Sequence, residues 1–198
     1  DKGNAARLHG LAALYEKGEG VPVDYPEALK LLREAGDKGD ATAQFNLGVM
    51  YQHGQGVEPS DAEAMKWYRV AAEQNFAKAM VVVGDAYQQG RGVPSDNAEA
   101  LKWFQRAANG TDPAMKALAE AKLGFLYDNG LGTSPDYAHA RQYYELAAAY
   151  GIASAQYNLG QMYRLGRGVK RDMAEAMKYY RLAADQGSAV AENAVGFA

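Results

Sequence analysis

Residues 43–57 read Ala43-Gln-Phe-Asn-Leu47-Gly48-Val-Met-Tyr51-Gln-His-Gly54-Gln-Gly56-Val57, and residues 60–72 read Ser60-Asp-Ala-Glu63-Ala64-Met-Lys-Trp67-Tyr68-Arg-Val-Ala71-Ala72. In the first stretch, Ala43, Leu47 and Tyr51 recur every four residues, which is the spacing of one face of a helix. Gly54 follows where a left-handed residue commonly ends a helix. The second stretch has a similar apolar stripe, and we expect Leu47, Tyr51, Tyr68, Ala71 and their counterparts in the other copies to be buried. The pattern therefore predicts two helices joined by a glycine-rich turn.

The same unit recurs along the chain. The tyrosine of a Tyr-x-x-Gly-x-Gly turn stands at positions 15, 51, 87, 127 and 163, in steps of 36, 36, 40 and 36 residues. The longer step contains Thr111-Asp112-Pro113, an N-cap followed by Pro, which predicts about one extra helical turn and an irregular junction there. A fixed period of this size indicates an all-α solenoid of tandem antiparallel helix pairs.

We therefore expect residues 1–198 to form a single solenoid domain. The expected repeats are approximately 7–42, 43–78, 79–118, 119–154 and 155–190, with partial repeats at 1–6 and 191–198. Both ends interrupt the pattern, which favours a piece of a longer array over a natural closing helix. We expect a monomer or weak end-to-end association.

Two further features of the repeat predict local contacts. Capping boxes, in which an N-cap side chain and a Glu three residues later satisfy each other's backbone donors, are expected at Asp24/Glu27, Ser60/Glu63, Asp96/Glu99 and Asp172/Glu175. The fourth copy has Asp136 with His139, which predicts a weaker cap. Glycines recur in mid-helix at positions 48, 84, 124 and 160, which predicts a neighbour too close for a methyl group. The first copy has Ala12 there, which predicts a looser or different contact.

Composition and charge narrow the function classes. Hydrophobic residues make up 48% of the chain, which is typical of a globular protein, and there is no cysteine for a disulfide or a thiolate metal site. The net charge of −3 gives no electrostatic reason to expect nucleic-acid binding. No apolar run approaches the roughly 20 residues of a membrane-spanning helix.

No motif predicts catalysis, a cofactor or a metal. His9, His53 and His139 are scattered and lack metal-ligand spacing. The Gly-x-Gly turns are flanked by helices, whereas a dinucleotide loop follows a strand. The repeated glutamates are explained by capping, and the in-phase aromatic residues of the second helices by core packing. We therefore expect a protein that is not an enzyme.

The first helices also carry a sector that differs in every copy, opposite the repeated Leu and Tyr. A variable surface on a repeated framework is what a binding face would show, and large apolar residues among polar ones are typical of interface hot spots. The alternative is that these side chains only pack against adjacent first helices. The candidate partner-binding residues are Phe45, Asn46, Val49, His53, Asp85, Gln88, Lys122, Phe125, Tyr157, Asn158 and Arg164.

The pattern Ala-x-x-x-Leu-Gly-x-x-Tyr-x-x-Gly-x-Gly-Val, followed by Glu-Ala-x-x-x-Tyr-x-x-Ala-Ala-x-x-Gly, resembles the Sel-one-like repeat (SLR) family, relatives of the tetratricopeptide repeat. The resemblance covers essentially the whole chain. It implies a right-handed superhelix whose first helices line the concave face, and a scaffold or adaptor role, often in exported or periplasmic bacterial proteins. A cysteine-rich branch is associated with penicillin-type ligands, but this chain lacks its cysteine pair.

The leading hypothesis is a non-enzymatic scaffold that binds a peptide or protein partner in its concave groove. One alternative is binding or hydrolysis of a small ligand such as a cell-wall fragment or β-lactam. Another is a purely structural spacer within a larger protein. A deep, enclosed pocket would favour the small ligand, and a wholly polar inner face would favour the spacer.

Overall fold

A computed structural model describes residues 2–196 of the chain, and within them it contains eleven helices and no strand. The helices are α1 (Lys2–Lys17), α2 (Tyr25–Asp37), α3 (Ala41–His53), α4 (Asp61–Glu73), α5 (Ala77–Gln89), α6 (Asn97–Ala108), α7 (Pro113–Asn129), α8 (Tyr137–Tyr150), α9 (Ala153–Leu165), α10 (Met173–Ala184) and α11 (Ala189–Gly196). Odd-numbered helices are the first helices of the repeats, and even-numbered helices are the second. The all-α architecture of tandem helix pairs is therefore confirmed.

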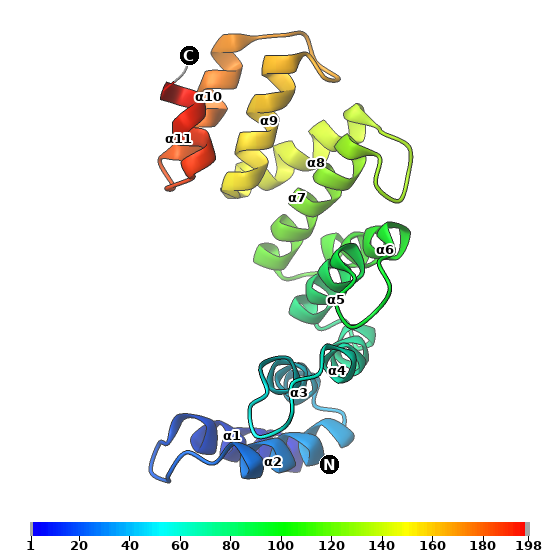
Figure 1. The fold of residues 1–198 in the computed structure, drawn as a ribbon, viewed down its shortest axis with the longest axis vertical. Coiled ribbons are helices and arrows are strands. Elements are labelled where there is room, and N and C mark those ends of the chain that lie inside the picture. Colours follow the sequence, from blue (N-terminus) through cyan, green and yellow to red (C-terminus); the bar gives the residue numbers. More distant parts are fainter. Residues whose placement is uncertain (1, 197–198) are drawn as a thin grey trace. The chain divides into compact units, whose positions relative to one another are not determined.

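The chain forms two compact units, Asp1–Asp96 and Asn97–Ala198. In the first unit each of the helices α1 to α5 packs against the next, and in the second unit the helices α6 to α11 do the same (Figure 1). In the second unit α7 also contacts α9, the first helix of the following repeat.

The core consists of the repeated apolar positions. Leu47, Tyr51, Tyr68 and Ala71 are all buried, as predicted. Leu47 also lies against Gly36 of α2, so this position packs on the second helix of the preceding repeat. Its counterpart in the first copy, Leu11, is 41% exposed, contrary to prediction, because the described residues before α1 include no second helix to cover it.

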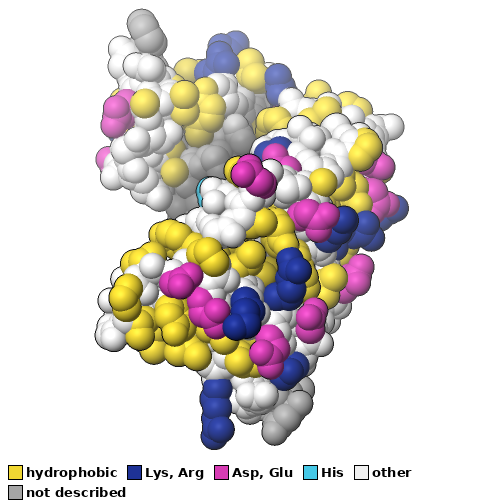
Figure 2. Space-filling view, turned by 60° about the horizontal axis from the view of Figure 1, so that its bottom comes forward, with side chains coloured by type: hydrophobic (Ala, Val, Ile, Leu, Met, Phe, Trp, Pro, Cys, Tyr) yellow, Lys and Arg dark blue, Asp and Glu magenta, His cyan; other side chains and the backbone are white. Residues whose placement is uncertain are grey.

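Other large hydrophobic residues of the first copy are exposed as well. They include Leu14 on α1 and Val23 in the turn that follows it. Figure 2 looks toward α1 and α2 and shows hydrophobic side chains gathered on that face of the first unit. The tyrosine position is less buried than predicted as well, since the side chains of Tyr15, Tyr87, Tyr127 and Tyr163 are only half-buried.

Three of the four mid-helix glycines, Gly48, Gly124 and Gly160, are explained by an aromatic ring of the same repeat. A Cβ atom on Gly48 would lie 2.4 Å from the ring of Tyr68, and one on Gly124 would lie 2.5 Å from the ring of Tyr144. Gly160 faces Tyr180 in the same way. The close contact predicted for these glycines is thus confirmed. Its partner is the second-helix tyrosine, whose ring takes the space of the missing methyl group.

The first copy replaces both members of this contact. Ala12 stands at the glycine position and Leu32 at the tyrosine position, and both are fully buried. The methyl group of the alanine and the smaller leucine side chain fill the space that glycine and a tyrosine ring fill elsewhere. The predicted difference at Ala12 therefore comes from a paired substitution within one repeat.

The predicted capping boxes are only half formed. Each observed cap accepts as expected, for example the side chain of Asp24 from the Glu27 amide and that of Ser60 from the Glu63 amide. The reciprocal bond from the glutamate was predicted wrongly. The backbone N–H of the cap donates instead to the carbonyl of the turn tyrosine, from Asp24 to Tyr15 at 3.0 Å and from Ser60 to Tyr51 at 2.8 Å.

The same backbone bond recurs in the other three copies. It joins Asp96 to Tyr87, Asp136 to Tyr127, and Asp172 to Tyr163. The glutamates of the boxes pair instead with the lysine three residues later, and these pairs are Glu27–Lys30, Glu63–Lys66, Glu99–Lys102 and Glu175–Lys178. The cap thus joins the start of each second helix to the end of the helix before it.

The cap at Asp136 is formed in full, although it lacks the glutamate. Its carboxylate accepts from the amides of Ala138 and His139 at 3.0 Å, as Asp172 does with the equivalent amides in the next copy. The backbone bond from His139, followed by that from its ring, lowers the pKa of Asp136. The predicted weakening of this cap therefore has no counterpart in its geometry.

The long fourth repeat is also as predicted. Asp112 caps α7, Pro113 occupies its first turn, and the helix has 17 residues, whereas α3, α5 and α9 have 13 each. The four additional residues amount to about one helical turn.

Candidate partner-binding face

All eleven candidate residues lie on first helices, and together they are called here the first-helix face. Helix α3 carries Phe45, Asn46, Val49 and His53, α5 carries Asp85 and Gln88, α7 carries Lys122 and Phe125, and α9 carries Tyr157, Asn158 and Arg164. Phe125 is 39% exposed, and His53 and Arg164 are exposed as well. The other eight are half-buried.

Two of these residues are engaged in contacts within the first unit. The ring of Phe45 packs against the rings of Tyr68 and Phe76, with centroids 5.3 and 5.4 Å apart. The amide of Asn46 lies 3.1 Å from Nε2 of His9 in the preceding repeat. Phe45 and Asn46 therefore help to join neighbouring helices, in line with the packing alternative, and offer only part of their surface to a partner.

A hollow recurs where a first helix, its own second helix and the next first helix meet. Three such niches are resolved, each within one unit, and they are named by their two first helices. The α1–α3 niche has a volume of about 160 Å³, the α3–α5 niche about 10 Å³ and the α9–α11 niche about 480 Å³. Repetition of the framework therefore repeats the hollow, while the side chains decide how much of it is open.

The linings of the niches differ in charge. Glu16 of α1 lines the first niche, and the equivalent position holds Gln52 in the second and Arg164 in the third. In the α3–α5 niche the Gln52 side chain accepts a hydrogen bond of 2.8 Å from the Tyr68 hydroxyl, and Asp61 and Arg91 add one charge of each sign to the lining. Burial raises the pKa of Tyr68 to about 12, so it remains a neutral donor there.

Four predicted residues line these niches. Asn46 and Val49 belong to the α1–α3 niche, and Tyr157 and Arg164 belong to the α9–α11 niche. Phe45, His53, Asp85, Gln88, Lys122, Phe125 and Asn158 line none of the three.

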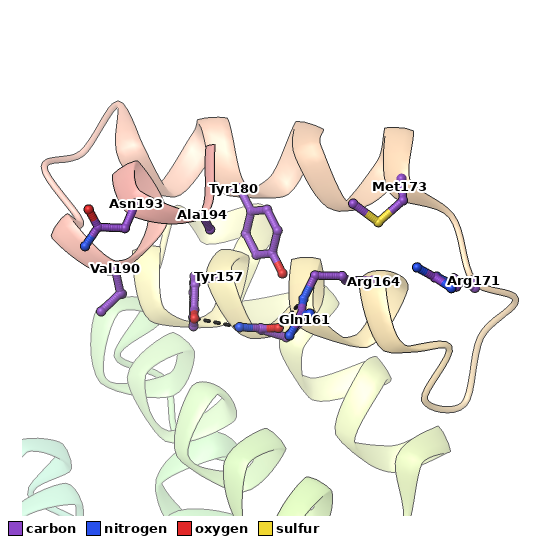
Figure 3. Close-up of a pocket in the computed structure, with 9 residues that line it drawn as sticks. All are labelled: Tyr157, Gln161, Arg164, Arg171, Met173, Tyr180, Val190, Asn193 and Ala194. Atoms are coloured by element: carbon purple, nitrogen blue, oxygen red, sulfur yellow. Dashed lines mark hydrogen bonds between the residues drawn. The ribbon is translucent and has the colours of Figure 1, made fainter. Parts of the chain in front are cut away.

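The α9–α11 niche is the largest of the three and is shown in Figure 3. Tyr157, Gln161 and Arg164 lie on one side of α9 because they are four and three residues apart. Arg164 donates from Nε to the Gln161 side-chain oxygen at 2.9 Å, and the Gln161 amide nitrogen donates to the Tyr157 hydroxyl oxygen at 2.6 Å. This chain of bonds links the three side chains and leaves the Tyr157 hydroxyl hydrogen available, while the Arg164 guanidinium also lies at the Tyr180 hydroxyl.

The remaining lining comes from other elements. Arg171 lies in the turn before α10, Met173 and Tyr180 lie on α10, and Val190, Asn193 and Ala194 lie on α11 (Figure 3). Tyr180 is 1% exposed, and its hydroxyl forms no hydrogen bond of normal geometry among the described residues. Burial raises the pKa of Tyr180, and the adjacent Arg164 guanidinium opposes this shift.

These residues, apart from Tyr157 and Arg164, were not among the predicted site residues. The signal that could have found Arg171 is its repeat position, which holds Val23, Pro59, Ser95 and Pro135 in the other copies. A cation there departs from the pattern. The side chains that surround Arg171 are set by the packing of three helices. The sequence period does not predict this packing.

The described part of the chain offers no group of three or more His, Asp or Glu residues arranged to hold a metal ion. His9 lies between Asn46 and Asp40, and His139 stacks on the ring of Tyr127. None of the helices described between residues 2 and 196 is long and apolar enough to cross a membrane.

Comparison with known proteins agrees with this architecture. The Sel1 repeat profile matches residues 5–40, 41–76, 77–112, 117–151 and 153–188, which together span most of the chain. No curated protein matches the chain significantly.

Among solved structures, a Sel1 repeat protein from Oxalobacter formigenes is 37% identical with a TM-score of 0.90, and the match covers 96% of this chain and 77% of that one. A protective antigen of uropathogenic Escherichia coli strains, which displays an SLR fold, is 36% identical with a TM-score of 0.89. That match covers 98% of this chain but only 41% of the antigen. An immunity protein from Pseudomonas aeruginosa, at 23% identity and a TM-score of 0.54, shares the fold. With five matched repeats and these structural relatives, the chain belongs to the Sel1 repeat family.

Proposed function

We propose that this chain is a non-catalytic interaction module that binds a segment of another protein along its first-helix face. The observation that carries the proposal is the recurring niche, whose framework is repeated while its lining changes from acidic to neutral to basic. Within the first unit, two neighbouring hollows with different linings suit side chains of one extended partner, since each niche can select a different side chain.

The exposed aromatic residues of this face support the same function. Phe125 is 39% exposed, and Tyr157 lines an open niche. Aromatic anchors of this kind commonly supply most of the binding energy of an interface. A purely structural spacer would not need them, and it would not need open niches.

The test is selection of binding peptides from a random display library on the intact protein. Bound peptides are then challenged with a Phe125→Ala/Tyr157→Ala variant and with a Lys66→Ala/Arg69→Ala control. The control residues are exposed and lie on the second helix α4. We expect most selected peptides to be lost from the first variant and kept by the control. Loss from the control alone would mean that partners bind the second helices, and failure to select any peptide would contradict the proposal.

A further inference from the structure

The α9–α11 niche contains two cations without acidic partners. Arg164 and Arg171 form no ion pair with any described residue, whereas the nearby Arg167 pairs with Asp128 at 3.3 Å. Arg164 donates from its Nε to a neutral amide, and its guanidinium also lies at the neutral Tyr180 hydroxyl, so neither contact neutralises its charge.

The other polar groups around the two arginines are neutral. The Tyr157 hydroxyl already accepts from Gln161, so its hydrogen is left to donate. The Tyr180 hydroxyl lies buried in the wall of the niche beside Arg164, and its hydrogen has no acceptor among the described residues. No Asp or Glu lines the niche. Neutral acceptors are present in Gln161, whose oxygen accepts from Arg164, and in Asn193, but the two arginines give the lining a net positive charge, which suits an anion.

The remaining lining residues indicate which kind of anion would fit the niche. Guanidinium groups bind carboxylates through paired parallel hydrogen bonds. Met173, Val190 and Ala194 add apolar surface beside the arginines. The volume of about 480 Å³ lies within the range of pockets that hold small molecules, so the niche has room for a carboxylate and an adjacent apolar side chain.

We propose that the α9–α11 niche binds an acidic side chain of a partner peptide, with the carboxylate between Arg164 and Arg171 and an adjacent apolar residue against Met173 and Val190. The proposal rests on the proposed function, because it assigns the partner chemistry of one niche on the same face. It also explains why the fifth copy alone has arginine at both positions. The other four copies have Glu16, Gln52, Gln88 and Asp128 at the position of Arg164, and Val, Pro or Ser at the position of Arg171.

The test uses an array of ten-residue peptides in which one central Glu, flanked by Leu or Met at varied positions, is compared with Gln and with phosphoserine at the same place. The best Glu peptide is then titrated by fluorescence anisotropy. We expect the Glu→Gln exchange in the peptide to weaken binding by about tenfold or more, since it removes charge-assisted hydrogen bonds. Raising the salt concentration should weaken the Glu peptide and leave the Gln peptide nearly unchanged.

The protein variants separate the niche from general attraction by positive charge. Arg164→Gln/Arg171→Gln should lower the affinity for the Glu peptide by about tenfold. This variant should then bind the Glu and Gln peptides with equal affinity. Lys170→Gln/Arg181→Gln removes the same charge from exposed residues of the same unit that do not line the niche, and it should change affinity by less than about threefold. Circular dichroism checks that both variants are folded.

The outcomes distinguish this proposal from the proposed function. Equal loss in both variants would mean that net charge, not the niche, attracts the peptide, and the proposal would be wrong. Binding of phosphoserine peptides alone would make the niche a phosphate site and overturn the carboxylate assignment. If Gln peptides bind as well as Glu peptides and depend on Phe125, the interaction function stands and the carboxylate assignment fails. No binding by any peptide of the array would also overturn the assignment.

Discussion

At the residue scale, buried glutamine side chains link the second helices of neighbouring repeats by hydrogen bonds. Gln44 donates to the Gly36 carbonyl at 2.8 Å and accepts from Gln74 at 2.6 Å. Gln156 makes the equivalent pair of bonds in the fifth copy, with the Ala148 carbonyl and Gln186. Each amide therefore connects the end of one second helix to the end of the next.

The fourth copy has a glutamate at this position. Glu120 is only 5% exposed, and burial raises its pKa, although Lys116 on the same helix opposes the shift. Tyr143 of α8 lies near Glu120. The pKa of Tyr143 is raised mainly by burial, then by Tyr127 and then by Glu120. An ionised carboxylate has no hydrogen to donate to a helix carbonyl, whereas an amide or a protonated carboxyl has one.

We therefore expect Glu120→Gln to stabilise the protein at pH 7 by on the order of 1 kcal/mol, the net value of one amide hydrogen bond. The pKa of Glu120 is higher in the folded protein than in the unfolded chain. Relative to the variant, the wild type is therefore most stable at a pH below the unfolded-state pKa, and it loses this stability as the pH rises through the folded-state pKa. The advantage of the variant should thus be small at pH 4 and full at pH 7, as measured by urea unfolding. An advantage that is larger at pH 4 would contradict this account, and Gln156→Glu should show the opposite trend.

At the element scale, the contact between the two helices of a repeat depends on the glycine and the tyrosine ring together. Gly48→Ala should destabilise the protein by about 1–3 kcal/mol, since the new methyl group overlaps the Tyr68 ring. The control is Gly10→Ala on α1, where nothing lies within 4 Å of the new Cβ. There the better helix propensity of alanine should stabilise by about 1 kcal/mol.

A double variant tests whether the pair acts as a unit. Gly48→Ala/Tyr68→Leu reproduces the Ala12 and Leu32 combination of the first copy. In chemical unfolding we expect it to lose less stability than the sum of the two single variants, with a coupling of about 1 kcal/mol. Strict additivity would show that the first copy is not an alternative packing of the same contact.

These contacts also show how far the sequence predicts the structure. Hydrophobic period, turn glycines and N-caps are local, so the helices, their order and the extra turn of α7 could be predicted. The partner of the cap N–H could not, because the Tyr51 carbonyl competes with the Glu63 side chain and only the folded turn decides between them. The openness of the niches could not be predicted either. Periodicity placed Tyr157 and Arg164 on one face, but Arg171 and Val190 join them only through packing of the turn and α11.

At the scale of the whole molecule, the single-domain prediction can be tested with the two tryptophans. Trp67 lies in the first compact unit and Trp103 in the second. The third Sel1 repeat, residues 77–112, takes α5 from one unit and α6 from the other. Since the repeat period runs through this boundary, we expect the chain to unfold as one cooperative body.

The measurement is urea unfolding of Trp67→Phe and Trp103→Phe, each followed by the fluorescence of its remaining tryptophan and by circular dichroism. Within each variant the two probes should give the same midpoint if unfolding is two-state. Separate midpoints would show that the two units unfold as independent domains, and the single-domain prediction would be wrong.

The central claim is that the first-helix face binds a protein segment, and calorimetric titration of a display-selected peptide tests it most directly. The titrated proteins are the wild type, Phe125→Ala, Tyr157→Ala and the Lys66→Ala/Arg69→Ala control. We predict that each aromatic truncation costs about 2 kcal/mol of binding free energy, or about thirtyfold in affinity, and that the control binds like the wild type. Wild-type affinity in both aromatic variants together with weakened binding in the control would contradict the claim and place the partner on the second helices.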